Sequence, residues 1–546
     1  MVGCGRVLSV ICWKVDLLVS PGPRMNCYFK DYFPGNRMLL YDVDWLRKRR
    51  VKVVHAALML RKRELGINRP GTQFLCGAYE FYQCVHPSKA LHGIDRKGFV
   101  LKRFSPCGRY LICFTSTYHS VSVRNYTTFA RAYENVNAFE DVFPERFTLN
   151  VVSDAEEGSM LMRDCLFITP DSRHIIVAVE SMVSDAAATL LDLYRNNESL
   201  VRVSSQALSN ITFITIDLQD GSICDRYQLN VDRVWVTHGV HLVGRLFAIL
   251  SLQHQTIHFL HIDERTGSFV ILNKVGRHLY DDDDIVSMGM HDDDQVVFTG
   301  LKQRLLTALY RRCVRAGCVP QFLHMFSQLR SLRMWQMQII DSDLVLIRFV
   351  QEDAFTSGAP ISMAPAVYVF YDWRNAEIIN VFERNSQHFG KIVERCLEEL
   401  KHPELLDNRF PCTAQYCQQG ALLYERIKFF LVHITGESRS ETYRRLVSQL
   451  PFSTTLAPTN TPYLDPSMFS YDDRLLAIVE RMRLPDKEVV KFHSRVTGLP
   501  LFKMIVSRGR YVQLLFHPSE PFAISADRSH PNTRATFHVP PLVPST

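Results

Sequence analysis

Three histidines lie close together in the sequence, at His254, His258 and His261, and imidazole is the commonest side chain that binds metal ions. If this segment is a β-strand, His254 and His258 share one face and His261 points to the other. No third ligand follows locally on the shared face. We therefore interpret the three as polar positions on a half-exposed strand, with a metal site as the alternative.

Two acidic runs, Asp281–Asp284 and Asp292–Asp294, flank a short apolar strand. Carboxylates at such density bind cations or basic tails. The D-x-D-x-D-G spacing of a calcium loop is absent. We expect a solvated loop here, and contact with a basic partner is the alternative.

The 14 cysteines of this 546-residue chain are too dilute for a disulfide scaffold, and no Cys-x-x-Cys occurs. The closest spacings are Cys313 with Cys318 and Cys412 with Cys417, and neither has a second ligand pair nearby. We interpret these as free buried thiols in a reducing compartment.

The sequence contains no phosphate-binding G-x-x-x-x-G-K-S/T, no G-x-G-x-x-G, no H-E-x-x-H and no G-x-S-x-G. It therefore predicts a protein that is not an enzyme, with no cofactor, no metal and no small-molecule substrate. No apolar segment reaches the roughly 20 residues of a transmembrane helix, so we also expect no membrane contact.

The charge is unevenly distributed along the chain. There are 63 Lys and Arg residues against 56 Asp and Glu, a formal net charge of +7. Residues 1–70 hold 14 of the basic and five of the acidic residues, so this part carries +9 and the remainder carries −2. A protein that coats nucleic acid would carry basic residues through its folded part, which argues against that class.

The basic residues gather in a possible amphipathic helix from about Asp44 to Leu65. Its cations include Arg47–Arg50 and Arg61–Arg63, and its apolar stripe consists of Trp45, Val54, Leu58 and Leu65. Such a helix can dock into a groove on a partner or pack on its own domain. A nuclear-import signal and contact with an anionic surface are further interpretations.

From about residue 99 a phrase recurs in which an aromatic or apolar strand end is followed by a tight turn and a buried strand. It occurs at Phe104–Phe114, Phe167–Ala178, Phe469–Val479 and Phe516–Ser525. Strand–turn–strand hairpins alternate with it, some with Asp-Gly or Thr-Gly at the tip to supply a positive φ. These are Phe213–Ile223, Thr256–Val270, Val367–Ile379 and Val490–Leu499. This series is typical of a mainly β fold, a β-propeller of WD-like blades, and a β-sandwich is the alternative.

Apolar residues at three- and four-residue spacing predict helical insertions in the propeller. The expected helices are Leu301–Ala316, Phe322–Trp335, Phe389–Leu400, Leu422–Ile434 and Ser440–Leu450. We divide the chain into an extension at residues 1–50, a basic helical segment at 51–70 and a propeller at 71–546. The insertions fall near 301–335, 388–402 and 420–450.

Several segments resemble the De-etiolated family, in the family order and over roughly residues 53–540. They are Phe99–Tyr110, Gln255–His258, Ser327–Gln338, Arg444–Pro451, Pro462–Asp465, Phe469–Asp473 and Phe516–Ser525. The most specific is Gln-Leu-Arg-x-Leu-Arg-Met-Trp, which starts at Gln328. The chain departs from the family at Cys107, where aspartate is common, and residues 1–50 do not resemble it.

The resemblance implies a nuclear, non-catalytic scaffold or substrate receptor of a cullin-four RING ubiquitin ligase. Its implied partners are the damaged-DNA-binding adaptor propeller protein, a small adaptor-associated protein, a ubiquitin-conjugating enzyme and the constitutive-photomorphogenesis RING ligase. The cullin-RING core would be bound indirectly. The implied outcome is ubiquitination and proteasomal degradation of target proteins.

The resemblance also nominates residues for binding. The adaptor-binding candidates are Val54, His55, Leu58, Leu60, Arg61, Arg63 and Glu64, and the candidates for a signature interaction helix are Gln328, Leu329, Arg330, Leu332, Arg333, Met334 and Trp335. One alternative function is a chromatin propeller that holds histone tails on its acidic loops and represses transcription. Another is an enzyme that uses a propeller funnel.

Overall fold

A computed structural model describes part of the chain, from Lys89 to Val539. The described residues are 89–127, 138–152, 158–183, 189–193, 195–196, 198–200, 208–276, 301–356, 365–401, 447–448, 450–452, 469–470, 489–494, 500–505, 512–518, 520, 522–527 and 534–539. The expected extension, the basic segment, both acidic runs, the helix expected at Leu422–Ile434 and most of the helix expected at Ser440–Leu450 lie outside them.

The described strands form antiparallel sheets, of which five have four strands and one has three. The first two sheets contain β2 (Val100–Phe104), β3 (Tyr110–Phe114), β4 (Ser120–Asn125) and β5 (Glu145–Asn150), then β6 (Ser159–Ile168), β7 (His174–Met182), β8 (Ser209–Asp217) and β9 (Ile223–Asp232). The next two contain β10 (Val240–Val243), β11 (Leu246–Ser251), β12 (Thr256–Ile262) and β13 (Phe269–Val275), then β14 (Leu332–Ile339), β15 (Leu344–Gln351), β16 (Ala366–Asp372) and β17 (Glu377–Glu383).

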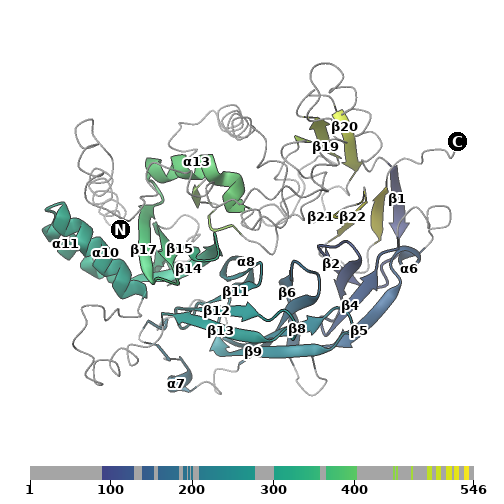
Figure 1. Cartoon of the computed structure of the whole chain (residues 1–546), viewed down its shortest axis with the longest axis horizontal. Coiled ribbons are helices and arrows are strands. Elements are labelled where there is room, and N and C mark those ends of the chain that lie inside the picture. Colours follow the sequence, from purple (N-terminus) through teal and green to yellow (C-terminus); the bar gives the residue numbers. More distant parts are fainter. Residues whose placement is uncertain are drawn as a thin grey trace.

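The last two sheets come from the C-terminal part of the described chain. One contains β18 (Phe469–Ser470), β19 (Val489–Ser494) and β20 (Pro500–Ile505), and the other contains β21 (Val512–Phe516), β22 (Ala523–Asp527), β23 (Ala535–Val539) and β1 (Lys89–Ile94). The first described strand thus pairs with the last, with Leu91 opposite Phe537. This pairing closes the ring of a β-propeller, and Figure 1 shows the sheets from β2 to β17 following one another in chain order. The predicted fold class is confirmed.

Where the structure describes them, the turn phrases and hairpins lie at the expected places, whereas most of Phe469–Val479 and the tip of Val490–Leu499 lie outside the described residues. The phrase at Phe104–Phe114 joins β2 to β3, and the one at Phe167–Ala178 joins β6 to β7. In the hairpins, Gly221 and Gly267 adopt φ of +76° and +70°, which a side chain would disfavour. Local turn chemistry therefore sets the register of these blades.

The turns of neighbouring blades are also joined to one another. The ring Nε2 of His517 donates to the Gly108 carbonyl at 2.8 Å, and the backbone N–H of Cys107 donates to Ser172 Oγ at 3.0 Å. Asp171 stands in its turn where Cys107 stands in the preceding one, and it forms an ion pair with Arg245 at 2.6 Å. Cys107 lacks this charge, so its blade is held to the next by a neutral hydrogen bond.

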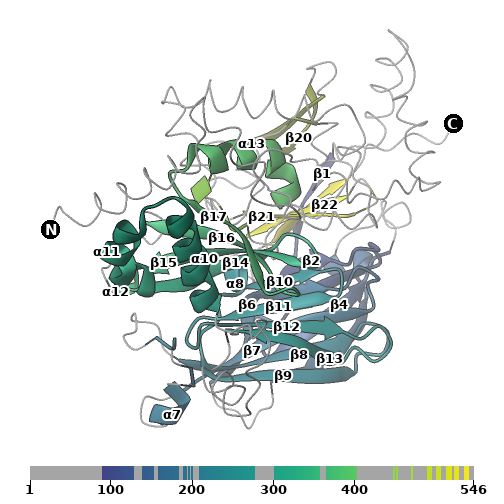
Figure 2. The same cartoon turned by 60° about the vertical axis from the view of Figure 1, so that its left-hand side comes forward.

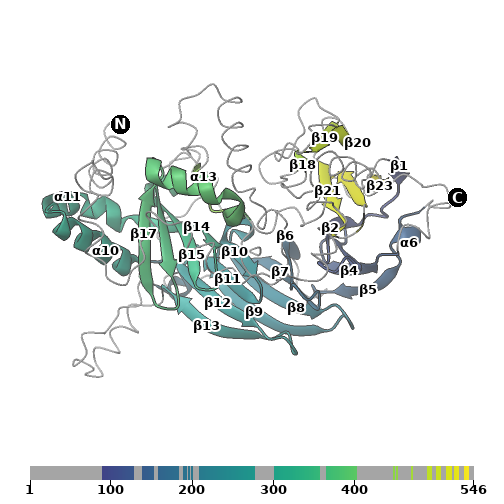
Figure 3. The ribbon, with the colours of Figure 1, turned by 45° about the horizontal axis from the view of Figure 1, so that its top comes forward.

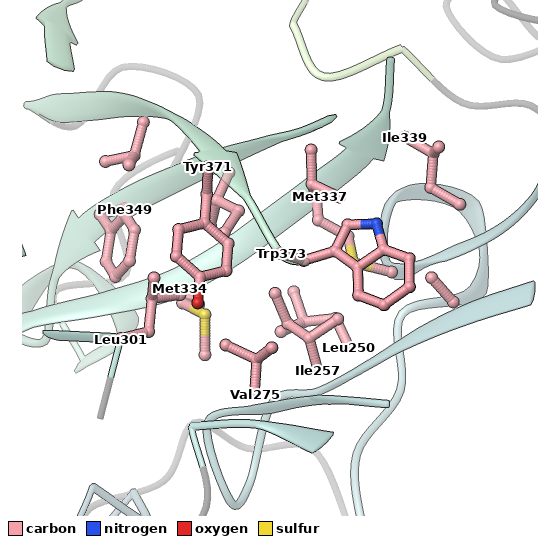
Figure 4. Packing of buried hydrophobic residues seen from close by; sticks show 14 of the residues in the cluster. Leu250, Ile257, Val275, Leu301, Met334, Met337, Ile339, Phe349, Tyr371 and Trp373 are labelled. Atoms are coloured by element: carbon pink, nitrogen blue, oxygen red, sulfur yellow. The ribbon is translucent and has the colours of Figure 1, made fainter. Parts of the chain in front are cut away.

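Hydrophobic clusters fill the space between successive sheets. Phe213 and Phe247 are in contact between β6–β9 and β10–β13, with ring centroids 5.5 Å apart. Phe259 and Trp373 stack between β10–β13 and β14–β17 at 4.5 Å. Figure 4 shows the second of these clusters, with Met337 of β14 among the side chains of the neighbouring sheet. From the sheet of β1 and β21–β23 through to the sheet of β14–β17, neighbouring blades are therefore joined by buried apolar contacts.

Three longer helices accompany the sheet of β14–β17. They are α10 (Leu301–Arg315), α11 (Val319–Arg330) and α13 (Gln387–Lys401). Helix α13 packs Phe389 and Val393 against that sheet, at one end of it (Figure 3). The short helices are α6 (Phe139–Val142), α7 (Leu190–Leu193), α8 (Val236–Gly239) and α12 (Asp353–Thr356). Within the described residues, no helix is long and apolar enough to cross a bilayer.

The helices expected at Leu301–Ala316 and Phe389–Leu400 are present, but the one expected at Phe322–Trp335 is too long. Helix α11 ends at Arg330, and strand β14 begins at Leu332. Leu332 lies three residues after Leu329, so it fits a helical stripe as well as a strand, and a short apolar run does not separate the two periods. From Leu332 to Met334 burial alternates, as in a strand.

Candidate interaction surface

The signature segment Gln328–Trp335 straddles the junction between a helix and a strand. Gln328, Leu329 and Arg330 end α11, whereas Leu332, Arg333, Met334 and Trp335 lie on β14. The expected interaction helix is therefore wrong for its last four residues. Leu332 and Met334 are buried in the cluster between β10–β13 and β14–β17, so these two side chains serve the fold.

The side chain of Gln255 holds the signature strand in place. Its Nε2 donates to the Met334 carbonyl at 3.1 Å, and its Oε1 accepts from the Met334 N–H at 2.6 Å. Gln255 itself has a φ of +54° and is buried. Two segments that resemble the family, Gln255–His258 and Ser327–Gln338, are thus joined by a paired hydrogen bond across two blades. No local sequence pattern indicates this contact, because 79 residues separate the partners.

Arg333 is committed to two ion pairs. Its guanidinium lies 3.0 Å from Glu198 and 2.9 Å from Glu352, and its side chain is only 12% exposed. Glu198 also binds Lys302 of α10 at 2.6 Å. Burial lowers the pKa of Lys302, while the neighbouring Glu198 raises it. This network fixes α10, β14 and the Glu198 loop to one another, so Arg333 is not available to a partner.

Trp335 lies against a second tryptophan near the surface. Its ring centroid is 4.9 Å from that of Trp235, which precedes α8 and is 36% exposed. His238 packs on Trp235 at 4.7 Å and its Nδ1 donates to the Pro451 carbonyl at 3.3 Å. Burial lowers the pKa of His238 to about 4, so its imidazole is neutral at pH 7. We call Trp235 and Trp335 the tryptophan pair. Tryptophan is common at the centre of protein interfaces.

The histidines do not form a metal site in the described part of the chain, where no group of three or more His, Cys, Asp or Glu side chains is placed to hold an ion. His254 precedes β12 rather than lying on it, and only His258 and His261 belong to that strand. His254 and His258 nevertheless line one cavity of about 240 Å³. Ser199 bonds to His254 at 3.2 Å and Tyr227 to His258 at 2.7 Å.

Asp232 also lines that cavity. It accepts hydrogen bonds from Ser251 Oγ at 2.9 Å and from the Gln253 N–H at 3.3 Å. Burial raises its pKa to about 6, against the opposing effect of these hydrogen bonds. Asp232 therefore holds the turn that leads into Gln255, and its position is structural.

The adaptor-binding candidates Val54, His55, Leu58, Leu60, Arg61, Arg63 and Glu64 lie outside the described residues, as do Cys412 and Cys417. Cys313 and Cys318 are free and buried in the α10–α11 hairpin. Burial, together with the neighbouring Cys318, raises the pKa of the Cys313 thiol to about 12. The prediction of free buried thiols is thus confirmed for Cys313 and Cys318.

Two curated plant proteins are similar to this chain over most of its length. One is the light-mediated development protein DET1 of Solanum lycopersicum, 23% identical, with 88% of this chain and 97% of that protein covered. The other is the light-mediated development protein DET1 of Arabidopsis thaliana, 22% identical, with 85% and 94% covered.

Among solved structures, the β-propeller domain of Cps50 (Swd1) from Myceliophteria thermophila matches 83% of this chain and 98% of that domain. The sequence identity is 9% and the TM-score is 0.34.

The family model described as De-etiolated protein 1 matches residues 163–540. This range contains Gln255, the tryptophan pair and the whole signature segment, and it covers well over half of the chain. The chain therefore belongs to the De-etiolated family.

Proposed function

We propose that this protein is a non-catalytic scaffold and substrate-receptor subunit of a nuclear cullin-RING ubiquitin ligase. In this role it binds the damaged-DNA-binding adaptor and a ubiquitin-conjugating enzyme, and it acts with the constitutive-photomorphogenesis ligase. Membership of the De-etiolated family supports a ligase-associated role in general. The tryptophan pair is the observation in this chain that supports a scaffold role. The signature segment positions an aromatic surface there, which suits protein binding, and no reactive groups.

We assign the two expected partners to two different parts of the chain. The basic segment at 51–70 is the candidate for the adaptor. The tryptophan pair lies on the propeller, where Gln255 and the Glu198 network hold its strand. A surface held in this way loses little conformational entropy on binding. We assign it to a second partner, the conjugating enzyme.

The test is purification of the tagged full-length chain from cells, with mass spectrometry of the native complex. Deletion of residues 44–66 is expected to abolish recovery of the adaptor. Trp235→Ala is expected to lower recovery of the conjugating enzyme on the order of tenfold, as truncation of an interface tryptophan does, and to leave the adaptor in place.

The matched control is Met182→Ala, which truncates an exposed apolar side chain of β7. It should change neither recovery. If the wild-type chain is recovered without the adaptor, the ligase proposal is wrong. If the adaptor is still recovered after the deletion, only the assignment of the N-terminal segment is wrong.

A further inference from the structure

We propose that the outward face of the α10–α11 hairpin binds a partner protein that presents apolar side chains surrounded by carboxylates. We call this surface the hairpin face and define it by Tyr310, Val314, Leu323 and Phe326, with the cations Arg311, Arg315 and Arg330. These residues are distinct from the tryptophan pair. Figure 2 shows the two helices standing beside the sheet of β14–β17.

The apolar part of the hairpin face is exposed. Tyr310, Val314, Leu323 and Phe326 are between 41% and 63% exposed, and Leu323 is the most exposed of them. They follow helical spacing, four residues apart on α10 and three apart on α11, so each pair lies along one side of its helix. Apolar side chains that gather on one surface mark interaction sites more often than single ones do.

The exposed residues are not needed to fix the hairpin to the propeller. A separate set of side chains does this: Leu301 and Leu305 enter the cluster between β10–β13 and β14–β17. Arg304 donates to the Ala376 carbonyl at 2.5 Å, and Arg312 to Asn380 Oδ1 at 3.2 Å. The hairpin therefore has a buried side that holds it and a second apolar side that faces outward.

The hairpin face is also preorganised. The Tyr310 and Phe322 rings are in contact at 5.4 Å, and the Phe322 and Phe326 rings at 6.0 Å. Phe322 is buried beside Cys313 and Cys318. Because the exposed rings rest on a buried one, little side-chain freedom remains to be lost when a partner binds.

The charge of the hairpin identifies the kind of partner. Residues 301–340 contain seven Lys and Arg and no Asp or Glu. Lys302 and Arg333 are paired with Glu198, whereas Arg311, Arg315 and Arg330 are exposed. Neither Arg311 nor Arg330 forms an ion pair within the described residues. A partner with carboxylates around its apolar contacts is complementary to this arrangement.

Other occupants fit less well. A second copy of the chain in a symmetric dimer would bring together two copies of the same cationic surface, at a cost in repulsion. A nucleic acid would neutralise the arginines but leave Val314 and Leu323 in contact with phosphate and sugar. The choice of a protein as occupant rests on the proposed scaffold role, and the test below does not depend on recovery of the adaptor.

The probe is a fluorescein-labelled amphipathic peptide, 18 residues long, with leucine at positions i, i+3, i+4 and i+7 and glutamate elsewhere. Its binding to the purified full-length chain is measured by fluorescence anisotropy. We expect saturable binding that weakens as salt is added, because exposed charge pairs are screened. We expect the same peptide with lysine in place of glutamate not to bind.

Two variants address the hairpin face directly. Leu323→Asp and Arg311→Glu are each expected to weaken binding of the glutamate peptide at least roughly tenfold, as loss of a central interface contact does. Arg311→Glu should also bind the lysine peptide better than the wild-type chain does. The matched controls are Met182→Asp and Arg226→Glu, which change an exposed apolar and an exposed basic residue elsewhere. They should leave binding unchanged, and circular dichroism checks that all four variants fold.

Three results would overturn the proposal. One is equal binding of both peptides. Another is competition by a single-stranded oligonucleotide or by phosphatidylserine vesicles that is as strong as competition by the unlabelled peptide. The third is tighter peptide binding after Asp281–Asp284 are replaced by serine, which would assign the hairpin face to the chain's own acidic run. If the peptide fails to bind but the adaptor is recovered from cells, the inference is wrong and the proposed function stands.

Discussion

Residues 301–340 contain two parts with opposite roles, the strand β14 and the α10–α11 hairpin. On β14 the signature residues Leu332 and Met334 are buried, and Arg333 is held between two glutamates. On the hairpin that precedes it, Leu323 and Phe326 are exposed and the nearby arginines face outward. The most recognisable part of the sequence therefore builds the junction between two blades. The hairpin face, a binding surface separate from the tryptophan pair, lies in residues whose pattern is that of an ordinary amphipathic helix.

The difference can be tested because it predicts large effects on stability for β14 and small ones for the hairpin face. The largest should come from Met334→Ala. Truncation of a buried methionine leaves a cavity and costs about 3 kcal/mol in the free energy of unfolding. Urea unfolding of the full-length chain measures this. The control is Met182→Ala, on an exposed residue, and a loss below 1 kcal/mol for Met334→Ala would contradict the structural role of the signature.

Arg333→Ala should have the next largest effect. It leaves Glu198 and Glu352 without their shared guanidinium, and loss of charged hydrogen bonds of this kind costs about 2 kcal/mol. The comparison is with Arg330→Ala, three residues earlier and exposed, which should change stability by less than about 0.5 kcal/mol. Equal effects of the two substitutions in urea unfolding would remove the distinction between a paired and an outward arginine.

The free energy of unfolding should also depend on pH through Asp232, which holds the turn that leads into Gln255. Its pKa of about 6 lies above the usual value of 3.8 because of burial, so the folded state favours the protonated carboxyl. The stabilisation this gives is complete below about pH 4 and is lost as the pH rises through about 6. Asp232→Asn should remove this dependence. The measurement is urea unfolding of both proteins from pH 4 to pH 8.

The prediction for Asp232 would be contradicted if stability changed with pH in the opposite direction. If wild-type stability rises relative to the asparagine variant between pH 4 and pH 7, the hydrogen bonds from Ser251 and Gln253 outweigh burial. Asp263→Asn is the control, because Asp263 is only half-buried and its hydrogen bonds with Thr266 lower its pKa to about 2. This second substitution should not alter the slope over the same range.

The contrast also explains what could be predicted from the sequence. Turns such as the one at Gly267 were predictable because a positive φ is a property of a few adjacent residues. The hydrogen bonds between Gln255 and Met334 were not, because these two residues are 79 positions apart in the sequence. The end of α11 was placed wrongly because Leu332 fits both a helical and a strand period.

The net charge of a long stretch of chain does not reveal a local cluster of basic residues. The part of the chain after residue 70 carries −2 overall, which suggested a nearly neutral body. Within it, residues 301–340 hold seven basic residues and no acidic one. An average over several hundred residues conceals such a block, whereas electrostatic attraction between proteins acts over about 10 Å at moderate salt. Local charge is therefore the quantity that indicates a partner.

The smallest expected effect on the free energy of unfolding comes from Leu323→Ala, and it is the most informative about the hairpin face. Leu323→Ala removes an exposed side chain, so the free energy of unfolding should change by less than about 0.5 kcal/mol. A loss above 1 kcal/mol would mean that another part of the chain covers Leu323. Leu323 would then contribute to folding, as Met334 does, and would not be available to a partner. Because Leu323 is 63% exposed, its apolar surface contributes little to folding. A residue that can be removed without loss of stability, yet weakens binding of an acidic peptide, separates recognition from folding within one hairpin.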